Sequence, residues 1–295
     1  MTPVAPEGLL LIDKPPGITS HDAVALVRRA IGTKKVGHAG TLDPMATGLL
    51  VIGVGRATRL LRFLADLPKT YEGTFRLGVE TDTLDADGTE VRRTSAEGLD
   101  PSTVASAANA LLGESMQTPP AYSAVKVGGQ KLYDAARKGE ELRAEARPIR
   151  VDRFDVSAGD LPDVEFVIAC SGGTYVRVLA ADVGTALGCG AHLTRLRRTA
   201  IGPLDVGVAT SPDEPGTPFP VEAAVAHLPR VDLDPEETIA AGHGRILGPA
   251  DIDGPYGVYG PDGGLVGIYR DDGTKAKPEM ILASTTGSRE QSDVR

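Results

Sequence analysis

The stretch GHAGTLDPMATGLLVIGVG, residues 37–55, joins a polar loop to an unbroken apolar run. Its second half, GLLVIGVG at 48–55, predicts a buried strand. One carboxylate, Asp43, is held between a leucine and a proline just before this strand begins. A lone acidic side chain at this position suggests a chemical role.

The elements on either side predict an α+β domain that extends to residue 209. Residues 9–12 form a short apolar strand, and Ser20 is expected to cap a helix that ends at Gly32. Further along we expect a helix at 57–65, a strand at 71–79, an acidic loop or hairpin tip at 80–90, a helix at 101–113, a strand at 164–170 and then an Ala-rich helix. The absence of a regular βαβ alternation in this pattern favours the α+β class.

Punctuation divides the rest of the chain. The stretch TSPDEPGTPFP begins at residue 210, and its prolines and glycine disfavour regular strand pairing. It predicts a linker over 210–231. From 232 to 284 short apolar pairs alternate with Gly, Pro and Asp, which predicts a small all-β module. Residues 285–295 are expected to be a disordered tail.

Bulk composition indicates a folded protein. The chain has 295 residues, 41% hydrophobic and 24% charged, which is ordinary for globular domains. No run approaches the roughly 20 apolar residues of a membrane span, and the N-terminus lacks a secretion pattern, so we expect no membrane partner and a cytoplasmic location. Cys170 and Cys189 lack metal-site spacing and are expected to be reduced core thiols. No metal is expected.

Charge is unevenly distributed along the chain. The net charge is −9, which argues at first against a nucleic-acid partner. Residues 1–77, however, carry ten Lys or Arg against six Asp or Glu, whereas residues 232–295 carry six against twelve. A polyanion could therefore meet a locally positive surface near Asp43. Chance asymmetry with an acidic, solvated tail is an equally good explanation of the charge alone.

Several familiar motifs are missing. Gly53 and Gly55 lack the third glycine of a dinucleotide fingerprint, and no phosphate-binding GxxxxGK[ST] occurs. There is no GxSxG or HExxH motif. The sequence therefore gives no sign of a nucleotide cofactor, a marked serine hydrolase or a zinc protease.

Five ordered blocks of the chain carry most of its polar motifs. They are LLIDKPPGITSHD (10–22), KKVGHAGTLDPMATGLLVIGVGRATRL (34–60), KTYEGTFRLGVETDTLDADG (69–88), PPAYSAVKVGGQKLYDAARKG (119–139) and CSGGTYVRVLAADVGTALGCGAHLTRLRRTAIG (170–202). Together they resemble the TruB family of tRNA pseudouridine synthases. The resemblance covers roughly the first 205 residues. It implies the pseudouridine-synthase fold, with a central mixed, largely antiparallel sheet flanked by helices, and a small C-terminal RNA-binding β-barrel (PUA).

The resemblance implies that Asp43 is the single essential catalytic carboxylate. Isomerising uridine to pseudouridine breaks the C1′–N1 bond, turns the uracil and rejoins it through C5. A carboxylate can attack C1′ or take a ribose proton to give a glycal, and neither route needs a cofactor. A retaining glycosidase would need a second carboxyl group about 5 Å away, and the sequence beside Asp43 supplies none.

The same resemblance assigns other residues. Tyr71 would stack on the base and could take the C5 proton, and Arg177 would pair with the catalytic aspartate. Substrate-binding positions also follow from the matched motifs, although each could serve the core or the surface alone. They are His38, Tyr175, Leu196, Lys14, Lys126 and Lys131.

RNA handling follows from the family and from physics. A stacked uridine exposes neither C1′ nor C5, so it must be flipped out of its loop. Residues 117–147 resemble a mobile thumb insertion that closes on RNA, with a charged helical hairpin as the alternative. The implied partner is the T stem-loop of tRNA, with uridine 55 as the target, and we expect a monomer.

Two other classes stay open. One is a non-catalytic RNA-binding or RNA-folding protein, against which the intact Asp43, Tyr71 and Arg177 argue. The other is an aspartate-nucleophile glycosidase or nucleosidase, which the missing second carboxylate disfavours. Comparing the binding of tRNA with that of a free nucleoside would separate them.

Overall fold

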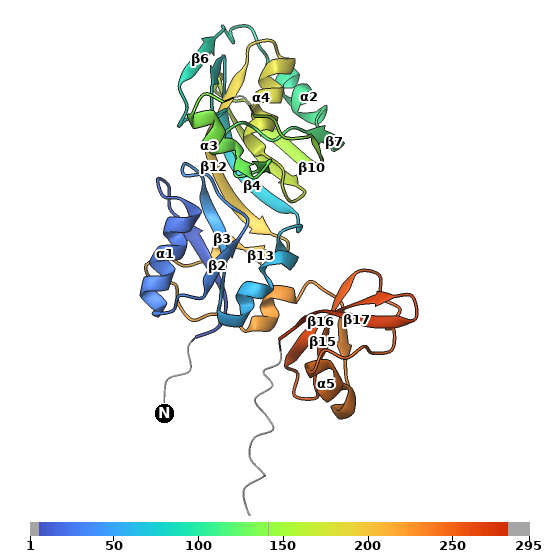
Figure 1. Ribbon diagram of the computed structural model, residues 1–295. Coiled ribbons are helices and arrows are strands. Elements are labelled where there is room, and N and C mark those ends of the chain that lie inside the picture. The colour runs from blue at the N-terminus through green and yellow to red at the C-terminus, as the bar shows by residue number, and fades with distance from the viewer. Residues whose placement is uncertain (1–5, 141, 283–295) are drawn as a thin grey trace, which may run out of the picture.

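A nine-stranded sheet forms the centre of the larger part of the molecule (Figure 1). The computed structural model describes residues 6–140 and 142–282, apart from the side chain of Lys131. The sheet order is β1-β3-β12-β4-β11-β10-β7, with β2 added on β3 and β13 on β12. Its strands are β1 (Gly8–Lys14), β2 (Val36–Ala39), β3 (Thr47–Val54), β4 (Lys69–Leu77), β7 (Gly113–Gln117), β10 (Arg147–Ser157), β11 (Asp163–Cys170), β12 (Ala191–Ile201) and β13 (Leu204–Asp205). Only the β3–β12 pair is parallel, so the predicted mixed, largely antiparallel sheet is confirmed.

Three helices flank this sheet: α1 (Ser20–Ile31), α2 (Pro101–Asn109) and α4 (Val176–Ala186). The cap of α1 is Thr19 rather than Ser20, because Thr19 and Asp22 form a reciprocal capping box. Ser20 instead exchanges hydrogen bonds with the backbone of Leu42. The predicted end of α1 is confirmed, since Gly32 closes it in the left-handed conformation at φ 67°.

The segment predicted as a helix at 57–65 is two 3-10 turns, η1 (Gly55–Arg59) and η2 (Leu61–Leu64). Their backbone bonds run from residue i+3 to i, as in Leu60 N to Ala57 O. Four apolar side chains are buried by these turns, Ala57, Leu60, Leu61 and Leu64. Burial on more than one side suits two short tight turns against the sheet better than one amphipathic helix.

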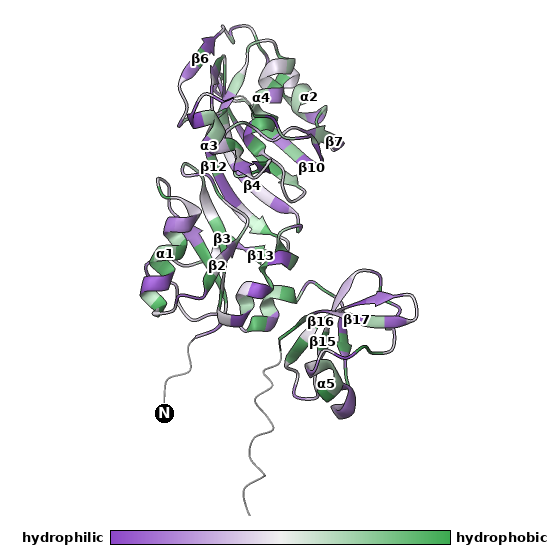
Figure 2. Cartoon of the chain, in the orientation of Figure 1, coloured by the Kyte–Doolittle hydropathy of each residue, from purple (hydrophilic) through white to green (hydrophobic). Residues whose placement is uncertain are grey.

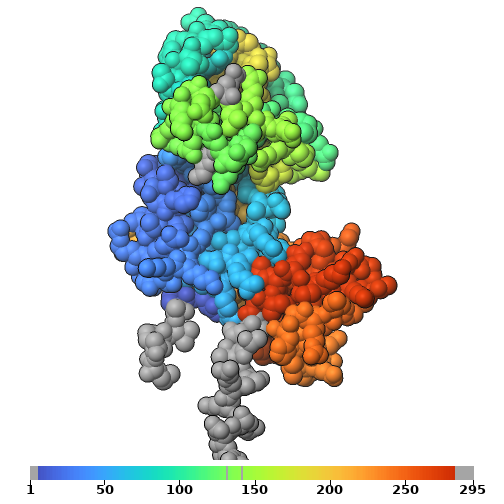
Figure 3. All heavy atoms as spheres, in the orientation of Figure 1, coloured from blue at the N-terminus to red at the C-terminus, as the bar shows by residue number. Residues whose placement is uncertain are grey.

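Two smaller substructures lie over the upper half of the sheet in Figure 1. The acidic stretch forms the predicted hairpin, with β5 (Val79–Thr81) and β6 (Glu90–Arg93). The predicted thumb segment forms a second hairpin, β8 (Lys126–Val127) with β9 (Gln130–Lys131), followed by α3 (Leu132–Arg137). In Figure 3 this green segment overhangs the blue N-terminal part of the molecule.

The C-terminal module is a four-stranded sheet with one helix. Its order is β14-β15-β16-β17, from β14 (Arg230–Asp232), β15 (Pro255–Tyr259), β16 (Leu265–Asp272) and β17 (Lys275–Ile281). The pattern of short apolar pairs did not predict α5 (Pro235–Gly242), which a capping box from Asp234 begins. Figure 2 shows the mixed hydropathy of this module, with hydrophobic β16 beside more hydrophilic ends of β17. The predicted tail at 285–295 lies outside the described residues.

Residues 210–231 connect the two parts and are packed rather than extended. Thr210 and Phe219 exchange backbone hydrogen bonds with β1, which covers the outer edge of that strand. The short turn η3 (Val206–Val208) precedes this stretch, and η4 (Val221–Val225) lies within it. In the described part of the chain no helix is long and apolar enough to cross a membrane.

Candidate active site

The loop that carries Asp43 connects β2 to β3 and is held from both sides. Lys14, fully buried at the end of β1, donates from Nζ to Pro44 O at 3.2 Å and to Ile18 O at 2.8 Å. The hydroxyl of Ser20 accepts from Leu42 N at 2.9 Å. The Lys14 ammonium and the Ser20 hydroxyl thus fix the loop before any ligand is bound.

Arg177 lies beneath Asp43 and joins it to a second carboxylate. Its Nη1 is 3.4 Å from Asp43 Oδ2 and 3.2 Å from Asp85 Oδ2, and its Nη2 donates to Tyr122 O at 2.7 Å. The Arg177 side chain is only 6% exposed, whereas that of Asp43 is 38% exposed. Arg177 is therefore a support, and Asp43 is the group that a ligand can reach.

Asp85 was missed by sequence reasoning, which found no second carboxylate beside Asp43. The turn between β5 and β6 buries Asp85, with Leu84 before it at φ 64°. Asp85 accepts hydrogen bonds from Thr83 Oγ1 at 2.6 Å and from Asp87 N at 3.2 Å. The signal was present in the acidic run at 80–90, but periodicity cannot show that one of its carboxylates turns inward. With its lone pairs so engaged, Asp85 orients Arg177 instead of offering a second free carboxylate.

The pKa of Asp43 is set by burial and by its charged neighbours. Desolvation by the pocket walls raises the pKa of Asp43, Arg177 opposes the rise, and Asp85 and Asp87 add to it. The carboxyl group keeps an open path to solvent although protein surrounds most of it. Perturbed carboxylates of this kind cluster at functional sites, which supports Asp43 as the reactive group.

Tyr71 and Leu196 lie on neighbouring central strands of the sheet. Tyr71 in β4 is 7% exposed, and Leu196 in β12 is also 7% exposed. Leu196 lies opposite Gly73, where an added Cβ would come within 2.3 Å of a backbone oxygen of β12. Burial raises the pKa of Tyr71, and the Asp43 charge adds to the rise. Tyr71 is therefore a neutral phenol in the free protein at pH 7.

His38 belongs to strand β2 rather than to a loop. Its ring packs edge-on against His21, with centroids 5.4 Å apart, and its buried Nδ1 has no hydrogen-bond partner among the described residues. Burial lowers the pKa of His38 to about 4, so the ring is neutral at pH 7. Lys14, which sequence reasoning placed among substrate-binding residues, has no exposed surface and acts through the loop.

The thumb segment forms a wall of the pocket. Tyr122 and Tyr133 pack at 6.3 Å between ring centroids, and the Arg137 guanidinium carbon lies 4.4 Å from the Tyr133 ring centre. Lys126 is exposed in β8. Lys131 belongs to β9, and its side chain lies outside what the structure describes.

Tyr175 precedes α4 and is fixed by a reciprocal pair of hydrogen bonds. Gln117 Oε1 accepts from Tyr175 N at 2.8 Å, and Gln117 Nε2 donates to Tyr175 O at 3.2 Å. The pair ties the edge strand β7 to the start of α4 and therefore sets the position of Arg177, two residues further on. The Tyr175 ring also lies 5.8 Å from the Arg177 guanidinium carbon.

These elements enclose a pocket of about 520 Å³. Its lining is Asp43, Pro44, Asp82, Thr83, Asp85, Asp87, Gly88, Thr89, Tyr122, Tyr133, Ala136, Arg137 and Arg177. In the described ranges no group of three or more His, Cys, Asp or Glu side chains could hold a metal ion.

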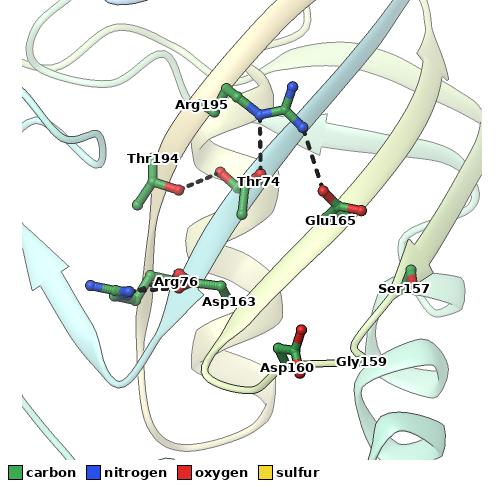
Figure 4. Close-up of a pocket in the computed structure, with 9 residues that line it drawn as sticks. All are labelled: Thr74, Arg76, Ser157, Gly159, Asp160, Asp163, Glu165, Thr194 and Arg195. Carbon is green, nitrogen blue, oxygen red and sulfur yellow. Dashed lines mark hydrogen bonds and ion pairs between the residues drawn. The ribbon is translucent and has the colours of Figure 1, made fainter.

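A larger hollow, of about 690 Å³, opens on the opposite face of the sheet (Figure 4). It is lined from β4 by Thr74 and Arg76, which alternate with the core-facing Phe75 and so point away from the Asp43 side. Its cations are already paired, as Arg76 is with Asp163 at 2.5 Å. The volume of a pocket alone therefore does not identify the reactive site. We assign the reactive site to the smaller pocket, which contains Asp43.

Comparisons with known proteins agree with this architecture. The TruB family pseudouridylate synthase N-terminal domain matches residues 28–176, and two C-terminal domains of tRNA pseudouridylate synthases match 177–212 and 228–283. The chain is 46% identical to the tRNA pseudouridine synthase B of Mycobacterium sp. strain KMS, over 95% of this chain and 97% of that protein. The corresponding Mycobacterium tuberculosis protein is 44% identical over the same shares. A solved Cbf5–Nop10–Gar1 complex holds a chain 26% identical, with a TM-score of 0.72 over 94% of this chain and 84% of the other.

Proposed function

The chain belongs to the TruB family of pseudouridylate synthases and forms pseudouridine in tRNA, and from this premise we propose that its target is uridine 55 of the T stem-loop, with Asp43 as the catalytic carboxylate. The observation that supports this role is the contrast between Asp43, which a ligand can reach, and the buried Arg177 that holds it at 3.4 Å. A charge-assisted contact of this kind keeps a carboxylate ionised and oriented.

The charge of the pocket favours a neutral ligand group. Four carboxylates line it, Asp43, Asp82, Asp85 and Asp87, against the two cations Arg137 and Arg177. A phosphate would be repelled there, whereas an uncharged uracil and its ribose would not. The flipped nucleoside therefore enters the pocket, and the phosphates of the loop stay outside it.

The reaction needs one carboxylate and no cofactor. Asp43 either attacks C1′ or removes a ribose proton to give a glycal, and the electron pair of the C1′–N1 bond leaves with the uracil. The uracil turns within the pocket, and C5 bonds to C1′. On the first route the bond between Asp43 and C1′ breaks as C5 attacks, and on the glycal route Asp43 returns the ribose proton, so the carboxylate is regenerated either way. A base then takes the C5 proton while N1 gains one from water, which restores the aromatic ring.

The other family positions divide between chemistry and RNA binding. We assign the C5 proton to Tyr71, which shares the Asp43 side of the sheet, and contact with the flipped base to Leu196 and His38. Tyr175 shapes the pocket beside Arg177. Lys126 and Lys131 lie on the thumb hairpin and bind the RNA backbone, and the C-terminal module adds RNA contacts as a PUA-like domain. One chain supplies the whole pocket, so a monomer suffices.

The RNA must displace the thumb to enter. Tyr122 O accepts from Arg177, and the ring of Tyr133 lies against that of Tyr122, so the segment covers the buried guanidinium before RNA is bound. Opening the segment makes room beside the accessible Asp43 for the flipped nucleoside, and reclosing excludes water.

The test is release of tritium from C5 of uridine in an unmodified tRNA transcript. Wild-type protein should release tritium to water, and Asp43→Asn should release none while it still binds the RNA. Asp82→Asn, an exposed change in the same pocket, is the matched control and should stay active. A transcript with cytidine at position 55 should abolish release, and release that persists there would place the target elsewhere. Tight RNA binding without release by the wild type would overturn the catalytic assignment of Asp43.

A further inference from the structure

Arg198, in the central strand β12, is a buried cation that the reaction described above does not use. It is 1% exposed, and its guanidinium donates from Nε to Leu49 O at 2.7 Å and from Nη2 to Gly40 O at 2.9 Å. No carboxylate in the described part of the chain forms an ion pair with it. Burying a guanidinium without a counter-ion is costly, so its presence under the site requires a reason.

The location of Arg198 joins three parts of the site. Its two acceptors belong to β3 and to Gly40, where the Asp43 loop begins. An added Cβ at Gly40 would lie 3.4 Å from Arg198 Nη1, so loop and guanidinium are in close contact. Across the strand pair, Arg198 is the register partner of Tyr71, and both side chains are buried on the same face of the sheet.

The groups that face Tyr71 act on its hydroxyl in opposite directions. Burial raises the pKa of Tyr71 most strongly, and Cys170 from β11 and Asp43 from the loop add to the rise. The charge of Arg198 lowers it. Lys69 also lies near Arg198, and burial lowers the pKa of Lys69 to about 8.

We propose that Arg198 is a positioning residue that fixes the Tyr71 side chain across the strand pair together with the loop that carries Asp43. The proposal rests on the proposed function where it makes Tyr71 the acceptor of the C5 proton. The Tyr71 hydroxyl gives its proton to water, the phenolate takes the C5 proton and becomes a hydroxyl again, and N1 gains a proton from water. Arg198 transfers no proton and remains charged throughout.

The test measures Tyr71 itself, without RNA. Replacing Tyr71 by 3,5-difluorotyrosine, a more acidic phenol, brings its titration into a range where the protein stays folded, and ¹⁹F NMR follows that one ring. In Arg198→Met we expect the titration midpoint to rise by at least about one pH unit, a tenfold fall in the acid dissociation constant. Arg198→Lys keeps a charge but cannot reproduce the planar set of donors, so a smaller rise is expected.

The neighbouring arginine supplies a matched control. Arg197 is on the same strand but points to the other face, where it pairs with Asp13 at 2.7 Å. Arg197→Met should leave the Tyr71 midpoint unchanged. An unchanged midpoint in either folded Arg198 variant overturns the proposal, as does an equal shift in Arg197→Met.

Activity gives a second readout with Tyr71 unmodified. Single-turnover pseudouridine formation should fall at least tenfold in Arg198→Lys, with the Kd for tRNA within about twofold of the wild type. A weaker Kd with an unchanged rate would make Arg198 a binding residue and overturn the proposal. Because the ¹⁹F titration needs no RNA, a wrong RNA target would leave its result intact, and the two failures can be told apart.

Discussion

Replacing Asp85 by asparagine should destabilise the protein and shift its pH profile at the same time. The side chains of Arg177 and Asp85 are 6% and 5% exposed, so their contact at 3.2 Å is a buried ion pair. An amide keeps an oxygen that can accept from Thr83 Oγ1, and Arg177 keeps Asp43, so the loss falls below the 3–5 kcal/mol of a fully broken buried pair. We expect about 2–3 kcal/mol. The melting temperature should then fall by about 5–10 °C.

The effect on activity has a defined sign. The Asp85 charge is one of the causes that raise the pKa of Asp43. Removing that charge lowers the pKa of Asp43, so the acid limb of the kcat/KM profile should move to lower pH if ionised Asp43 is the reactive form. Tritium release measured across pH reports this limb, and thermal melts report the stability.

The control for this change is Asp82→Asn. Asp82 lies in the same turn, is exposed, and accepts a hydrogen bond from Thr89 N that an amide oxygen can replace. It should cost less than about 0.5 kcal/mol and leave the acid limb in place. An Asp85→Asn protein that melts with the wild type, or whose acid limb moves to higher pH, would refute the reasoning.

Three further changes test other parts of the structure. The pKa of Asp43 is raised in the folded state, so its ionisation destabilises the fold above that pKa and has no effect on stability below the unfolded value of 3.8. Asp43→Asn should therefore raise the melting temperature near pH 7, and this gain should disappear on acidification. A mutant less stable than the wild type at pH 7 would contradict this. Gly48→Ala places a Cβ 2.3 Å from a backbone oxygen of β12 at φ 94°, so urea unfolding should show a free energy of unfolding lower by more than about 2 kcal/mol. Gly98→Ala, where φ is 82° and the space is open, should lower it by about 1 kcal/mol. Lys14→Met removes the buried donor to Ile18 O and leaves Pro44 O with Gly17 N alone, so the single-turnover rate should fall while the Kd for tRNA is kept; the reverse pattern would make Lys14 a substrate ligand.

Local signals predicted the local parts of the fold. Gly32 marks the end of α1, and Asp100 with Pro101 marks the start of α2, because caps depend on a few adjacent residues. The apolar run at 48–55 forms β3, and the matched motifs predicted the contact between Asp43 and Arg177. Each of these follows from a short segment or from a known motif.

The parts that sequence reasoning missed depend on distant segments. Asp85 is oriented by a turn whose inward direction no periodicity records, and Arg198 reaches Tyr71 only because β12 inserts between β3 and β4. That insertion makes β12 the parallel partner of β3 at Gly48, where a side chain would strike the β12 backbone. Strand order of this kind is a tertiary property, and the charged residues it buries resemble surface residues in the sequence.

The same dependence changes the meaning of the charge distribution. Part of the basic excess in residues 1–77 is used within the protein, because Arg56, Arg59 and Arg62 donate to backbone carbonyls at the end of the acidic C-terminal module. The opposite charges of the two parts therefore reflect, in part, the contact between them. The arginines that make this contact are not free to bind RNA. The cations that remain on the surface include Lys34 and Lys35 at the turn after α1, from which β2 leads to the Asp43 loop. Reversing Lys34 and Lys35 should weaken tRNA binding and flatten its salt dependence, whereas Arg59→Gln should disturb the module before it affects the RNA.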